Sequence, residues 1–188
     1  MATYDSYLIN ETVKDRSWLK QAAVVLGASF IIALFAPVAI PLPFTPIPLA
    51  TQAHVVLILS CLLGSKRASL AVLTFLFQGA IGLPVFAGGM AGIGVLAGPK
   101  GGYLLGYLAA AFVTGYIVER FAHRTSSKVF AAMAVGNLVV YLFGLPRLAL
   151  FVGWQNAFVL GMLPFLIGDA LKLVIATRSL KSLRFFNG

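Results

Sequence analysis

PFLIGDALK, residues 164–172, places a carboxylate and an ammonium inside an otherwise apolar stretch near the C-terminus. Asp169 and Lys172 are three residues apart, so on a helix they share one face. A lone charge at the centre of a membrane helix costs about 2.5 to 3.5 kcal/mol on insertion scales. The pair therefore indicates either a structural ion pair between two helices or a polar site for a ligand or ion. We favour the site, because other polar residues map to the same depth.

The whole chain has the composition of an integral membrane protein. Of its 188 residues, 60% are hydrophobic and 10% are charged, with a mean hydropathy of +0.97; soluble proteins average about 25% charged residues. We expect one membrane domain over residues 1–188, of which 1–18 form a polar cytoplasmic segment. The net charge of +9 comes from short basic groups between apolar runs. This pattern indicates membrane topology rather than nucleic-acid binding.

Six apolar runs are expected to cross the lipid bilayer as helices, which predicts an all-α membrane protein with long structured outer loops. They are residues 19–36, 49–63, 68–83, 103–118, 129–145 and 163–177. If the N-terminus is cytoplasmic, 11 of the 14 Lys and Arg residues lie inside, and only Lys100 and Arg147 lie outside. Basic residues favour the cytoplasmic side, so we expect both termini there.

The predicted outer connections differ from the inner ones. All nine prolines lie at or near the outer ends of spans, within or beside long apolar segments such as 37–48 and 82–102. Inner turns such as GSKR, residues 64–67, are short and basic. Part of this pattern is helix punctuation by proline. We further predict that the outer segments fold as a cap over a cavity that opens outward.

Polar side chains inside the spans map to the outer half of the membrane. Gln52 and His54 begin the second span, Gln78 lies late in the third, and Tyr141 lies late in the fifth. Each fits either a hydrogen bond between helices, worth about 0.6 kcal/mol on average, or a ligand contact. Their shared depth favours a ligand site. Asn137, one turn before Tyr141, is interpreted as a packing residue.

Small residues indicate where helices approach closely. Gly102, Gly106 and Ala110 recur every four residues, which predicts internal packing of the fourth span. Ala23 and Gly27 in the first span fit either an internal contact or an external protein partner, and periodicity does not separate these alternatives.

Several chemistries lack their usual residues. The chain has no GxxxxGK[ST] loop, so we do not expect it to hydrolyse ATP. The predicted topology separates the two histidines and leaves Asp169 as the only acid in the membrane, so we expect no metal site, no cofactor and no carboxylate pair for catalysis. A small membrane-embedded enzyme is therefore disfavoured. A channel or carrier for another solute would need polar residues along its whole path, and here they stop in the outer half.

Three motifs, GLPVFAGG (82–89), GPKGGY (98–103) and PFLIGDALK, resemble those of the BioY family, the biotin-binding S components of energy-coupling factor (ECF) transporters. The resemblance covers nearly the whole chain. It implies a six-helix protein of the prokaryotic plasma membrane that captures biotin from outside, either alone or with a transmembrane coupling protein and two ATPase subunits. It implies a transporter and not an enzyme.

The resemblance and the polar depth together suggest the functional residues. We expect the substrate-binding residues to be Asp169, Lys172, Tyr141, Gln52, Gln78, Phe86, Gly88, Gly89, Lys100 and Tyr103. Lys100 stands where the family usually has Thr, and Ala23 with Gly27 replaces the family's AxxxA pattern for the coupling protein. We expect the biotin ring near Asp169 and Lys172, because a carboxylate is less costly at the wetter mouth.

Overall fold

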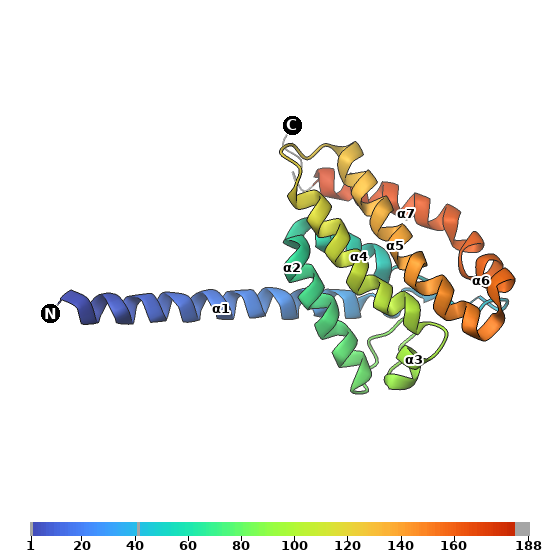
Figure 1. The fold of residues 1–188 in the computed structure, drawn as a ribbon, viewed down its shortest axis with the longest axis horizontal. Coiled ribbons are helices and arrows are strands. Elements are labelled where there is room, and N and C mark those ends of the chain that lie inside the picture. Colours follow the sequence, from blue (N-terminus) through green and yellow to red (C-terminus); the bar gives the residue numbers. More distant parts are fainter. Residues whose placement is uncertain (1, 41, 183–188) are drawn as a thin grey trace.

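The structure, a computed structural model, describes residues 2–40 and 42–182. Its elements in chain order are α1 (Ala2–Leu34), β1 (Ala39–Ile40), β2 (Leu49–Ala50), α2 (Gln52–Ala80), α3 (Ile93–Ala97), α4 (Gly101–Glu119), α5 (Ser126–Val152), α6 (Trp154–Gly161) and α7 (Leu163–Ser182) (Figure 1).

The chain is mainly helical, as predicted. Within the described residues, four helical stretches are long and apolar enough to cross a membrane: α2, α4, α5 and the stretch Trp154–Leu180, which includes α6 and most of α7. A shorter apolar stretch, Trp18–Leu34, lies in α1.

The helix α2 consists of two arms, residues 52–63 and 65–80. Gly64 separates them with φ +79° and ψ 175°, a conformation outside the helical region that favours glycine. The Glu119 carboxylate accepts two hydrogen bonds from Ser65, from the backbone N–H at 2.7 Å and from Oγ at 2.8 Å. A carboxylate at a helix N-terminus satisfies free N–H groups and favours the helix dipole. The predicted GSKR turn therefore corresponds to a break that Glu119 stabilises.

The helix α4 lies between α2 and α5 (Figure 1). A Cβ atom at Gly102 would overlap Phe143 and Arg147 of α5, and one at Gly106 would lie 3.0 Å from the Val140 backbone. Ala110, the third small residue, is fully buried. The predicted internal packing of this stripe is confirmed.

The helix α5 continues past Pro146 to Val152, so the predicted end of the fifth span at residue 145 is wrong. Proline removes one helical hydrogen bond, but Leu148 and Ala149 beyond it are buried. Their packing offsets the lost bond, as is common in membrane helices. The turn at Gly153, with φ +79°, leads into α6, a short helix that the sequence analysis did not predict.

The described parts of the two segments predicted to lie outside are structured and tied together. The strands β1 and β2 pair in antiparallel register, with Ala39 opposite Ala50, and close the proline-rich segment. In the glycine-rich loop, the Gly88 N–H donates to the Ala36 carbonyl at 2.9 Å, and the Gly92 N–H donates to the Gly79 carbonyl at 2.7 Å. In Figure 1, α3 and α6 lie at one end of the bundle, whereas the α4–α5 connection and the C-terminal end of α7 lie at the other.

Candidate functional site

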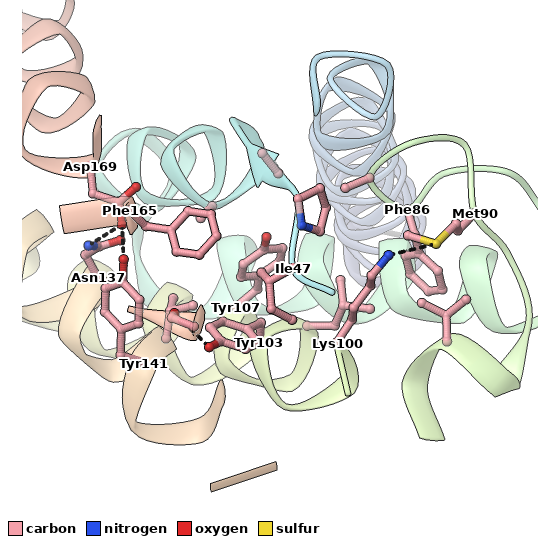
Figure 2. A pocket seen from close by; sticks show the side chains of 18 residues that line it. Ile47, Phe86, Met90, Lys100, Tyr103, Tyr107, Asn137, Tyr141, Phe165 and Asp169 are labelled. Carbon is pink, nitrogen blue, oxygen red and sulfur yellow. Dashed lines mark hydrogen bonds between the residues drawn. The ribbon is translucent and has the colours of Figure 1, made fainter. Parts of the chain in front are cut away.

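A cavity lies beneath the two outer segments. Its empty space, including the open mouth, is about 670 Å³. It is bounded by residues of both outer segments and of α2, α4, α5 and α7, most of them apolar or aromatic (Figure 2). The two segments predicted to lie outside therefore cover a cavity.

Asp169 of α7 forms the polar end of this cavity. Its Oδ2 atom accepts hydrogen bonds from the Tyr141 hydroxyl at 2.5 Å and from Asn137 Nδ2 at 3.2 Å (Figure 2). Its Oδ1 atom has longer contacts, 3.7 Å to His54 Nε2 and 3.9 Å to Lys172 Nζ. One carboxylate oxygen is thus held by two donors of α5, and the other is available to accept a hydrogen bond from a ligand.

Asp169 and the four side chains around it, Tyr141, Asn137, His54 and Lys172, form a polar cluster. Lys172 belongs to this cluster but does not line the cavity. Its Nζ atom donates to the carbonyl of Ala50 in β2 at 3.0 Å. The ammonium therefore links α7 to β2. It also balances the charge of Asp169 from a position that does not line the cavity. The two residues of the predicted pair are thus close together, and the predicted ligand contact of Lys172 stays a prediction.

Two further residues close to Asp169, Asn137 and His54, were not in the predicted set of substrate-binding residues. Asn137, which we interpreted as a packing residue, lines the cavity and donates to Asp169. His54 is 3% exposed, and neither ring nitrogen has a hydrogen-bond partner among the described residues. The depth of His54 was visible in the sequence, but its approach to Asp169 from α2 was not.

Aromatic side chains form the middle of the cavity wall. Tyr103 and Tyr141, both predicted, meet edge to face with ring centroids 6.4 Å apart. The Tyr103 hydroxyl donates to the Gly161 carbonyl at 2.9 Å. Tyr107 and Phe165 also line the cavity and were not predicted. Tyr107 lies one turn after Tyr103, so helical periodicity was the signal that could have identified it.

Phe86 lines the cavity from the glycine-rich loop, as predicted. Its ring packs edge to face on Phe75 at 5.5 Å and occupies the space where a Cβ atom at Gly79 would lie. Gly88 and Gly89 do not line the cavity, and their predicted substrate contact stays a prediction. Their φ values of +78° and +73° form the turn that returns the chain beside Phe86.

Gln52 and Gln78, also predicted to bind the substrate, do not line the cavity. Gln52 is fully buried, and its Nε2 atom donates to the carbonyls of Ile32 at 3.1 Å and Val85 at 2.8 Å. Gln78 Nε2 donates to Ser29 Oγ at 3.4 Å. Both residues link α2 to α1. They therefore make hydrogen bonds between helices, which was the alternative to a ligand contact.

Lys100 lines the cavity at the end away from Asp169 (Figure 2). It immediately precedes α4, and its Nζ atom donates to Met90 Sδ at 3.2 Å. Partial burial lowers the pKa of the Lys100 ammonium from its ordinary value. The cavity therefore has a carboxylate at one end and an amine at the other.

Ala23 and Gly27 lie on the exposed face of α1, away from the cavity. A Cβ atom at Gly27 would meet nothing within 4 Å. Ala28 and Ile32, on the opposite side of the helix, are buried. Of the two alternatives for the small pair, this arrangement excludes an internal contact at Gly27.

Comparisons with known proteins agree on one family. A model described as the BioY family matches residues 9–186. The biotin transporter BioY of Rhizobium etli is 40% identical, with 80% of this chain and 85% of that protein covered. The probable biotin transporter BioY of Pyrococcus horikoshii is 36% identical, with 84% and 93% covered.

A solved structure has the same fold. It is described as the S component for biotin from an ECF-type ABC transporter, and it matches with a TM-score of 0.81 and 24% identity. The match covers 92% of this chain and 95% of that one.

Proposed function

Because this chain belongs to the BioY family, we propose that it captures biotin from outside with high affinity and serves its uptake across the prokaryotic plasma membrane. It is a transport protein and not an enzyme. The observation that carries the proposal is the buried Asp169 carboxylate at one end of an otherwise apolar, aromatic cavity.

Biotin's chemistry fits this cavity. Its ring head carries two ureido N–H donors and a carbonyl acceptor, and its thioether ring and aliphatic arm are apolar. Asp169 Oδ1 supplies an acceptor for an N–H group, and Lys172 keeps the site near neutral before the ligand arrives. Tyr103 and Phe165 supply apolar surface for the ring and arm.

We expect the purified protein to bind labelled biotin saturably, with one site per chain. Equilibrium binding measures this, and unlabelled biotin should displace the label whereas thiamine, an unrelated vitamin, should not. A protein that elutes as a single species and binds no biotin would contradict the proposed function.

We also propose six membrane spans with both termini in the cytoplasm. The spans would be α1, the two arms of α2, α4, α5 and α7. The basic residues beside the Gly64 break and in the α4–α5 connection support this orientation, since such residues favour the cytoplasmic side. The cap and the mouth of the cavity would then face outward.

This topology predicts which exposed positions react with a membrane-impermeant maleimide. In a background where the buried Cys61 is replaced by Ala, a cysteine at Gln155 should react on intact cells, and one at Lys66 should react only after lysis. Both positions are exposed in the structure, so access depends on the side of the membrane. The reverse labelling pattern would invert the proposed orientation.

For its partners, we propose a transmembrane coupling protein and two ATPase subunits, with solitary transport as the alternative. The exposed Ala23 and Gly27 pair supports a partner, because small residues allow another helix to approach closely.

A further inference from the structure

We propose that Lys100 is a specificity-determining residue that pairs with the carboxylate of the ligand and thereby distinguishes biotin from its uncharged derivatives. The ring head would then lie at Asp169, and the aliphatic arm would run along the aromatic wall to the mouth. This inference rests on the proposed biotin function.

The charges at the two ends of the cavity favour this orientation. Asp169 is an anion at one end, and a ligand carboxylate beside it would be repelled. Lys172 offsets part of that repulsion from 3.9 Å, but it does not line the cavity, so a ligand carboxylate at this end would have no direct contact with a cation. At the other end, Lys100 presents a cation to the cavity, and Figure 2 shows it on the opposite side from Asp169.

Among the described residues, the acceptor found for the Lys100 ammonium is a weak one. Within residues 2–40 and 42–182, no ion pair is found for Lys100. Its contact is the thioether of Met90, a weak acceptor. A ligand carboxylate would replace this weak acceptor by a charge-assisted hydrogen bond.

Arg147 fixes the backbone that carries Lys100. Its guanidinium donates to the carbonyl of Ala97, through Nη2, and to that of Gly98 at 3.4 Å, through Nε. These bonds join the segment before Lys100 to α5. The backbone of Lys100 is therefore held in place before the ligand arrives.

The test compares the affinities of biotin and biotin amide, in which the carboxylate is neutral, for the purified full chain. Lys100→Met keeps most of the aliphatic side chain and removes the charge. We expect it to weaken biotin binding about fivefold, as for a partly exposed ion pair, and to change the affinity for the amide by less than about twofold. Lys100→Arg should keep the preference for biotin, and high salt should reduce that preference in the wild type.

Lys66→Met is the matched control, because it removes a lysine charge at an exposed position by the Gly64 break. It should leave both affinities unchanged. If Lys100→Met weakens both ligands equally, or weakens neither, the proposed role of Lys100 is wrong. If the wild type binds neither ligand, the proposed function itself fails. The two failures are thus distinguishable.

Discussion

Asp169→Asn is expected to lower the affinity for biotin by at least about tenfold, equivalent to 1.4 kcal/mol. The substitution keeps the shape of the side chain but leaves it only one acceptor oxygen. If that oxygen faces Tyr141 and Asn137, which donate to Asp169 in the structure, the amide N–H groups face the ligand donors. If it faces the ligand, the donors of α5 lose their acceptor. Either orientation leaves a buried donor unpaired.

The measurement is equilibrium binding of labelled biotin to the purified variant. Thr177→Val is a suitable control, because it removes another buried polar atom of α7 that does not line the cavity. Asp169→Asn also leaves the Lys172 charge without its partner, so folding can suffer independently of binding. The double variant with Lys172→Met removes both charges and separates the two effects. If this double variant binds biotin normally, the pair is structural and the proposed site is wrong.

Composition and basic residues were sufficient to predict the helical class and the position of one break. The GSKR turn coincides with Gly64, where the backbone needs a conformation that favours glycine. The fifth span was predicted too short because proline suggested a helix end at 146. The helix nevertheless continues past the proline, because Leu148 beyond it is buried against its neighbours. Burial depends on tertiary packing, which the local sequence does not contain.

Only part of the candidate site was predicted, again because tertiary packing is not visible in the local sequence. Sequence position gives the depth of a residue in the membrane, and Asp169 and Tyr141 were found in this way. Gln52 lies at a comparable depth, but it points toward the Ile32 carbonyl and away from the cavity. The direction of a side chain around its helix depends on which neighbours surround that helix. For the same reason Asn137 was assigned to packing, although it faces Asp169.

Gly27→Leu and Ala23→Leu are expected to reduce biotin uptake by cells at least about tenfold, equivalent to about 1.4 kcal/mol in the activation free energy of transport, while biotin binding to the purified protein stays unchanged. Both positions are exposed on α1, and a Cβ atom at Gly27 meets nothing within 4 Å. A leucine therefore fits the isolated protein. It would, however, hold away a partner helix that needs small residues for close approach.

Uptake is measured with labelled biotin in cells that depend on this chain, and binding is measured on the purified variants in parallel. Ala131→Leu makes the same change as Ala23→Leu at an exposed position of α5 and should affect neither measurement. Normal uptake with leucine at 23 and 27 would show that this face is not the coupling surface. If binding is lost together with uptake, the small pair instead supports the fold. A surface that only contacts a partner protein is not needed for ligand binding to the purified chain.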